Sequence, residues 1–124
     1  MQVEEQSGTN SMTMSKDLIA ASATPLILSI LSKGDSYGYD IIHKVSDLTG
    51  GQMQWADGML YPILHRLEKK GFVESYWGKA ASGRRRRYYG LRKPGLQELK
   101  EQRQNWSALS AWMQKLDAEK PCLS

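Results

Sequence analysis

Four consecutive arginines, Arg84 to Arg87, are the side chains whose type and spacing point most clearly to a chemistry. Guanidinium groups stay charged and bind phosphate through paired N–H donors. The window 62–93 holds ten basic residues against two acidic ones, a net charge of +8, whereas the rest of the chain carries −4. A confined positive field attracts a polyanion, most commonly nucleic acid. The alternative is a solvated basic surface that keeps the protein soluble.

Groups suited to catalysis or metal binding are scarce by comparison. His43 and His65 are the two histidines and have no metal-ligand spacing, Cys122 is the one cysteine, and no glycine-rich phosphate loop occurs. We therefore expect no enzyme activity, no metal and no cofactor. The longest apolar stretch, 25–31, is about a third of the roughly 20 residues that cross a bilayer, so we expect a cytoplasmic protein without membrane contact.

The beginning of the chain predicts a tail followed by two helices. With 124 residues, of which 40% are hydrophobic and 24% charged, one compact domain is expected. Residues 1–14 show no apolar period and should form a mobile tail. Ser15 can cap a short helix, and Thr24-Pro25 is typical of a second helix start, with Gly34 at its end.

Two further helices follow by the same criteria. Apolar residues recur at helical spacing from Ser36 until Gly50-Gly51. Asp57 is a candidate N-cap for the next helix, which Gly71 should end in the left-handed conformation. Pro62 lies five residues past that cap and has no backbone N–H to donate, so we expect an irregular first turn.

After Gly71 the sequence pattern changes from the periodicity of helices to that of strands. Residues 72–77 are rich in amino acids that favour strands, and 78–83 have the composition of a turn. We therefore expect 84–91 to form the second, basic strand of a hairpin. A last helix should run from Lys93 to Pro121. Its apolar seam steps by 3, 4, 3, 4 and 3 residues, with one polar position: Leu99, Gln102, Trp106, Leu109, Met113 and Leu116.

This order of elements predicts a mainly α fold with a small β-hairpin. Three helices and a two-stranded wing over 15–92 form a winged helix-turn-helix, and 93–120 form a separate C-terminal helix. In that arrangement the third helix enters the major groove of double-stranded DNA, and the wing reaches the backbone. Strand alternation points two of the four arginines to each face of the hairpin, so only part of the run can touch one phosphate ridge, and we expect Arg84 and Arg86 to do so. The expected DNA-binding residues are Tyr37, Met59, Tyr61, His65, Arg66, Lys69, Lys79, Arg84 and Arg86.

Several of these residues have a purely structural alternative. Tyr37 can be a core tyrosine with a solvated hydroxyl group, and His65 an ordinary surface residue of a helix. Arg85 and Arg87 can pair with Glu74 across the hairpin. A winged helix that binds another protein, and not DNA, is the alternative function, and it would leave the basic wing unused.

Three segments in this order, 37–41, 60–71 and 82–89, resemble the PadR family of bacterial transcriptional regulators. They read Tyr-Gly-Tyr-Asp-Ile, Leu-Tyr-Pro-Ile-Leu-His-Arg-Leu-Glu-Lys-Lys-Gly and Ser-Gly-Arg-Arg-Arg-Arg-Tyr-Tyr. The resemblance implies a homodimeric winged-helix repressor on a pseudo-palindromic operator. It also implies dimerisation through the last and first helices, here through Leu18, Leu99, Trp106, Leu109, Met113 and Leu116.

Trp106 is large for a close helical seam and can face its own symmetry mate across a two-fold axis. Some members of the short PadR branch place a tryptophan at a similar position and stack flat aromatic compounds between the two copies. The resemblance therefore implies a small aromatic effector at Trp106, with Ser110 one turn later. The alternative is that Trp106 belongs to a closed dimer core.

Overall fold

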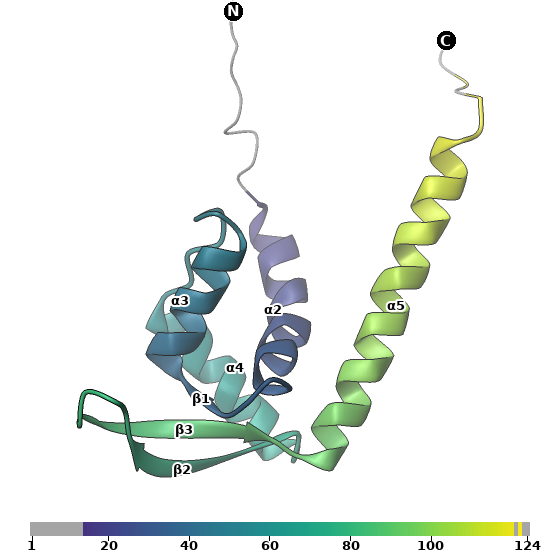
Figure 1. The fold of residues 1–124 in the computed structure, drawn as a ribbon. Helices are drawn as coiled ribbons and strands as arrows, with labels where there is room; N and C mark the ends of the chain where they lie inside the picture. The colour runs from purple at the N-terminus through teal and green to yellow at the C-terminus, as the bar shows by residue number, and fades with distance from the viewer. Residues whose placement is uncertain (1–13, 121, 123–124) are drawn as a thin grey trace, which may run out of the picture.

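Three helices and a three-stranded sheet surround the core, and a fourth, longer helix extends beyond them (Figure 1). The computed structural model describes residues 14–120 and 122. The helices are α2 (Lys16–Leu31), α3 (Gly38–Leu48), α4 (Asp57–Lys69) and α5 (Lys93–Asp117), and the strands are β1 (Ser36–Tyr37), β2 (Val73–Lys79) and β3 (Arg85–Leu91). The expected mainly α fold with a small hairpin is confirmed. Most of the expected tail over 1–14, and Pro121, lie outside the described residues.

Helix α2 is a single helix where two were predicted. Ser15 caps it as expected, its side chain accepting a hydrogen bond of 3.1 Å from the Leu18 N–H. The second start at Thr24-Pro25 was wrong, because the helix continues through Pro25. A proline inside a helix costs about 3 kcal/mol. Here α2 buries one long face in the core on both sides of Pro25: Ala23, Ile27, Leu28 and Leu31.

Ser36 begins a strand and not the predicted helix. Strand β1 pairs antiparallel with β3, with Ser36 opposite Tyr89 and Tyr37 opposite Tyr88, and α3 begins only at Gly38. The Ser36 side chain is buried and donates a hydrogen bond of 2.7 Å to Asp40 in the first turn of α3. The physical reason for the difference is pairing with a segment about fifty residues away, which a local apolar period does not reveal.

Helix α4 is continuous through Pro62. Its N-cap is Ala56 and not the predicted Asp57, which lies in the first turn. The N–H groups of Met59 and Leu60 both donate to the Ala56 carbonyl at 3.0 Å, so the first turn includes one bond of the tighter 3₁₀ spacing. Gly71 has φ of 81°, which confirms the predicted left-handed end of this helix.

The predicted hairpin is confirmed, and β1 extends it to a sheet of order β1-β3-β2. We refer to β2, β3 and their connecting turn, residues 73–91, as the wing. In the middle of β2 the Tyr76 hydroxyl donates a hydrogen bond of 2.5 Å to Asp35. This bond raises the pKa of Tyr76 to about 12. It fastens the hairpin to the turn that precedes β1.

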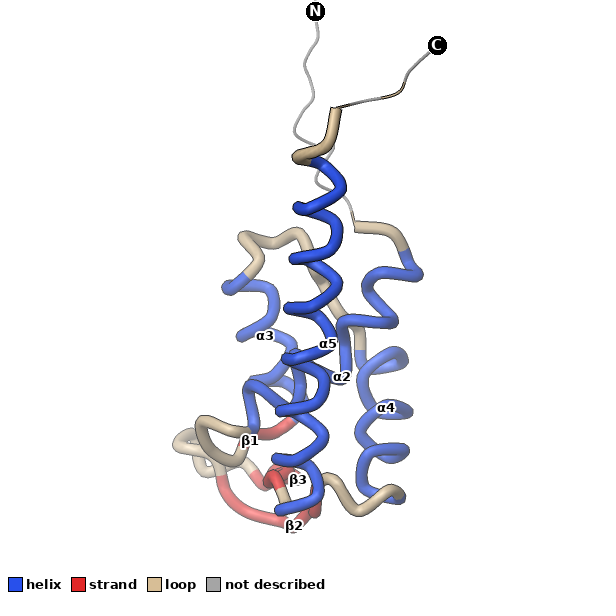
Figure 2. The backbone as a smooth tube through the Cα atoms, turned by 90° about the vertical axis from the view of Figure 1, so that its right-hand side faces the viewer, coloured by secondary structure: helices blue, strands red, loops and turns tan. Residues whose placement is uncertain are grey.

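Helix α5 packs on the body through the part that precedes Leu109. Leu99 is fully buried, and Gly95 approaches the Phe72 carbonyl so closely that a Cβ at this position would overlap it. From Leu109 to the end of the helix every described side chain is exposed. Figures 1 and 2 show that α5 runs alongside α2 and that its distal half continues beyond the other helices. The helix ends at Asp117, before the predicted end at Pro121.

Candidate nucleic-acid interface

Helix α4 is amphipathic, with one side in the core and a polar face toward solvent. One stripe is buried, formed by Leu60, Ile63, Leu64 and Leu67. His65, Arg66 and Lys69 are exposed on the helix, as their spacing predicted. A rigid helix with basic side chains on its free side has the dimensions that fit a DNA major groove.

A groove of about 390 Å³ lies between α4 and the wing. It is lined by residues of both elements: Tyr61, His65, Trp77, Arg84, Arg85, Arg86, Arg87 and Tyr89. All four wing arginines therefore border the same groove as Tyr61 and His65 of α4, and the lining contains no carboxylate. Arg84 and Arg86 were the two expected to touch one phosphate ridge, and all four arginines are among the residues that line this groove.

Aromatic rings on the wing and near β1 hold the arginine side chains. The Arg85 guanidinium lies 4.7 Å from the centre of the Trp77 ring, and that of Arg87 lies 5.8 Å from it. The Arg86 guanidinium lies 5.0 Å from the Tyr37 ring and 5.4 Å from the Tyr39 ring. Cation–π contacts of this kind restrict the guanidinium groups while leaving their N–H donors available to a phosphate.

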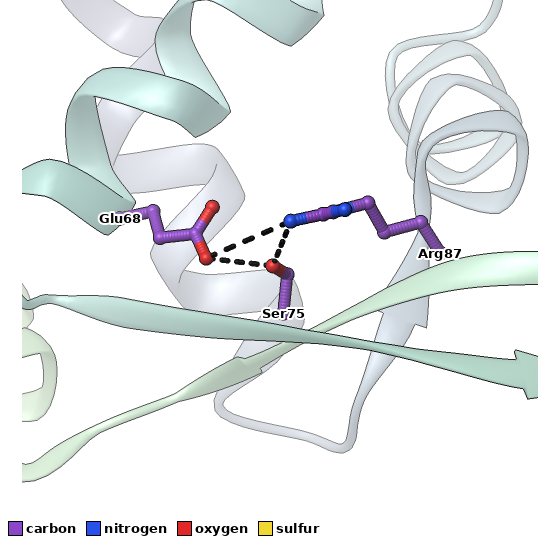
Figure 3. Close-up of polar contacts among 3 residues, drawn as sticks. All are labelled: Glu68, Ser75 and Arg87. Atoms are coloured by element: carbon purple, nitrogen blue, oxygen red, sulfur yellow. Dashed lines mark hydrogen bonds and ion pairs between the residues drawn. The ribbon is translucent and has the colours of Figure 1, made fainter.

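Arg87 is also tied to α4 by a three-residue network (Figure 3). Its guanidinium donates a hydrogen bond of 2.7 Å to the Ser75 hydroxyl, which in turn donates one of 2.6 Å to Glu68. The ion pair between Arg87 and Glu68 measures 3.9 Å. The alternative raised from the sequence, that Arg87 pairs with Glu74 across the hairpin, is therefore wrong. The network fixes the spacing between wing and helix on which the groove depends.

The remaining predicted DNA-binding residues lie at the edges of this surface. Tyr37 is half-buried, in edge-to-face contact with Tyr88 at 5.3 Å between ring centres. Tyr61 is half-buried in the groove wall, and Lys79 is exposed at the end of β2. Met59 packs partly against the core and lines a different hollow, described below.

Sequence reasoning missed Trp77, Tyr39 and Ser75 as parts of this surface. Trp77 is 55% exposed, which is unusual for the largest side chain. Its register partner across the hairpin is Arg87, so pairing the two strands from the turn outward would have placed these residues side by side. Tyr39 and Ser75 gave no comparable signal, since their contacts join segments far apart in the sequence.

The positions predicted for dimerisation and effector binding divide into two groups. Leu99 is buried within its own chain, and Trp106 is half-buried. Ser110 and the remaining apolar positions are exposed to different degrees: Leu18 37%, Leu109 43%, Met113 57% and Leu116 67%. The distal part of α5 thus carries an apolar surface with no partner in the described chain.

Replacing Gly38 with alanine is expected to lower the free energy of unfolding by about 1–3 kcal/mol, the usual cost of overpacking. A Cβ on Gly38 would collide with the hydroxyl group and ring of Tyr61. The matched control is Gly58→Ala, because a Cβ there meets nothing within 4 Å. Urea unfolding measures both variants. Equal stability of the two would show that Gly38 does not position Tyr61.

A metal-ligand cluster and a membrane-spanning helix are both absent from the described residues. No three His, Cys, Asp or Glu side chains within this part of the chain are grouped so that they could hold a metal ion. Among the helices of residues 14–120, none is both long and apolar enough to cross a membrane.

Comparison with known proteins agrees with this geometry. Residues 27–101 match the transcriptional regulator PadR-like family. An uncharacterized protein of Lysinibacillus sphaericus is 33% identical over 91 residues, which cover 73% of this chain and 84% of that protein. The transcriptional regulator YqjI of Escherichia coli is 38% identical over 48 residues, 39% of this chain and 23% of its own length.

Solved structures are similar along most of the chain. A PadR-like transcriptional regulator of Bacillus cereus superposes with a TM-score of 0.75 at 27% identity, covering 85% of this chain and all of that one. A transcriptional regulator of Clostridium thermocellum gives 0.73 at 32% identity, covering 81% of this chain and 97% of that one. The chain therefore belongs to the PadR-like family of transcriptional regulators, with the family's winged-helix fold.

Proposed function

We propose that this protein is a homodimeric repressor, acting in the cytoplasm, that binds a pseudo-palindromic operator in double-stranded DNA. The observation that supports this best is the groove between α4 and the wing, where four arginines meet the polar face of a helix. Because guanidinium groups bind phosphate oxygens bidentately, the wing follows the DNA backbone while α4 lies in the major groove.

The residues on α4 and the wing would have different tasks. Arg66 is exposed on the free side of α4 and is long enough to bind a guanine edge, the commonest base-specific contact. Arg84, Arg86 and Lys79 lie on the wing, where phosphate contacts fix position and contribute affinity without reading sequence. Tyr37 and Tyr61 donate hydroxyl hydrogen bonds at the groove edge.

The dimer would form through the distal half of α5. Large apolar side chains along this helix are exposed in the single chain: Leu109, Trp112, Met113 and Leu116. A long, unpartnered apolar helix face is costly in water and supports an association with a second copy. A two-fold dimer then presents two copies of α4 to two half-sites.

An aromatic effector would act at the same interface. Trp106 is half-buried on α5 and Ser110 is exposed one turn further on. In the proposed dimer, two Trp106 rings near the two-fold axis would stack a flat aromatic compound between them, and the bound compound would release the operator.

The test is fluorescence anisotropy with a labelled duplex from this gene's own upstream region, against a scrambled duplex, at two salt concentrations. Tight and salt-sensitive preference for the native duplex is expected, since each neutralised phosphate releases counterions. Equal weak binding to both duplexes would contradict sequence-specific repression from this site. No binding at low salt would favour the alternative, a winged helix that binds another protein.

Single substitutions separate base reading from phosphate binding. Arg66→Ala is expected to cost about 1–3 kcal/mol and to relax the preference at one base pair. Lys79→Ala should weaken all duplexes alike and reduce the salt slope by about one phosphate contact. The control is Lys120→Ala, which removes the same charge beyond the end of α5. A uniform effect of Arg66→Ala on all sequences would contradict its role as a base reader.

A further inference from the structure

A second hollow, of about 420 Å³, lies on the other side of α4, between this helix, the start of α2 and the loop that precedes α4. Its lining is Lys16, Ile19, Ala20, Gln54, Trp55, Met59, Ile63 and Arg66. Ligand pockets commonly measure about 300–1,000 Å³ and combine apolar walls with a few polar groups. This hollow has both features, and Trp106 is not among the residues that line it.

The lining is apolar in its walls and positive in charge. Ile19, Ala20, Met59 and Ile63 supply aliphatic surface, and Lys16 and Arg66 are the charged residues among the lining. Neither cation forms an ion pair within the described part of the chain, where the pairs are Lys44 with Asp40 and Arg87 with Glu68. An unpaired positive charge beside an aliphatic wall complements an anion with an aliphatic body.

Trp55 provides a second, independent observation. Its side chain lines the hollow and is only 5% exposed, yet its Nε1–H has no hydrogen-bond acceptor among the described residues. A buried indole N–H without an acceptor costs about 1–3 kcal/mol. A shift of the ring would therefore lose no existing hydrogen bond, and the test below asks whether the N–H responds to a bound anion.

We infer that this hollow binds an amphiphilic organic anion, a medium-chain carboxylate, with its aliphatic body against Ile19 and Ile63. Its carboxylate is held by Lys16 and Arg66, and the Trp55 N–H supplies a donor as the ring adjusts. All of the residues that line the hollow belong to one chain.

Arg66 connects this site to DNA binding, a step that rests on the proposed function. Besides the hollow beside α2, Arg66 lines a separate depression on the exposed face of α4, together with His65, Glu68 and Lys69. A carboxylate that draws the Arg66 guanidinium toward α2 removes it from the face that meets DNA. Carboxylate and operator therefore compete, and each weakens the other by the same factor.

The direct test follows the indole N–H signals of the ¹⁵N-labelled full-length protein by NMR, without DNA. Trp55 is assigned through Trp55→Phe and Trp106 through Trp106→Phe. Octanoate is expected to shift the Trp55 signal saturably, whereas octan-1-ol and octylammonium, of equal chain length, leave it in place. A shift confined to Trp106, equal shifts with all three compounds, or no shift because a second copy fills the hollow would each overturn the inference.

Variants then test the charge and the connection to DNA. Lys16→Gln is expected to weaken octanoate binding by about two- to fivefold, the range for an exposed charge pair, and to leave operator affinity unchanged. Lys33→Gln, at an exposed position beyond the end of α2, is the matched control and should change neither. Equal weakening of octanoate binding by both substitutions would show that the effect comes from the overall charge of the protein and not from Lys16 in the hollow.

Because the NMR test contains no DNA, the site and the repressor function fail separately. If octanoate shifts Trp55 but leaves operator affinity unchanged, the site stands and its competition with DNA through Arg66 is wrong. If the protein binds no operator, the octanoate titration still decides whether the hollow is a carboxylate site.

Discussion

Replacing both Leu109 and Met113 with glutamate is expected to leave the chain folded but to convert the dimer to monomers. Both side chains are exposed in the single chain, so charges there cost the fold little. In the dimer they would be buried without partners, which costs several kcal/mol. Operator affinity should then fall by about two to four orders of magnitude, because the second half-site is no longer tethered to the first. Sedimentation velocity and anisotropy measure the two effects.

The matched control adds the same charge to the opposite side of the same helix. Gln104→Glu combined with Ala111→Glu changes two exposed positions that lie off the apolar seam. This control should remain dimeric and bind the operator as the unmodified protein does. Dissociation of both double variants, or of neither, would contradict dimerisation through the seam.

Leu99→Ala is expected to lower the free energy of unfolding by about 2–5 kcal/mol, because it opens a cavity in a fully buried site. Leu99 is 0% exposed and joins α5 to the core. The matched substitution is Leu116→Ala, on the same helix at 67% exposure, which should cost little in a monomer. Both are measured by urea unfolding in the Leu109→Glu/Met113→Glu background, so that subunit association does not contribute.

A similar loss of stability from both alanine substitutions would contradict this division of α5. It would mean that the distal half of the helix also packs on its own chain. The expected difference would instead show that one apolar seam serves two purposes, with its first turns anchoring the helix and its distal turns remaining free for a partner.

Features of the fold that depend on local sequence could be predicted. The Ser15 cap, the left-handed Gly71 and the hairpin over 73–91 follow from residues within a few positions of one another. Pro25 was misjudged because burial of α2 outweighs a local helix-breaking signal. The strand at Ser36-Tyr37 was misjudged because its hydrogen-bond partner is β3, far along the chain.

The candidate site divides in the same way. Helical periodicity was sufficient to place His65, Arg66 and Lys69 on the exposed face of α4. It did not reveal what orients the wing arginines, because Arg87 reaches Ser75 and Glu68 through contacts between different elements. The charge of the surface was therefore predictable from composition, whereas its geometry required the tertiary structure.

The most direct test of sequence-specific binding by a dimer is selection of duplexes from a random library by the full-length protein, followed by sequencing. Two copies of α4 related by a two-fold axis predict an enriched, two-fold symmetric sequence. Its half-sites should be centred about one helical turn apart, roughly 10 base pairs, or a multiple of that distance. Enrichment of an asymmetric single site, or recovery of a library without any preferred sequence, would contradict the proposed homodimeric repressor.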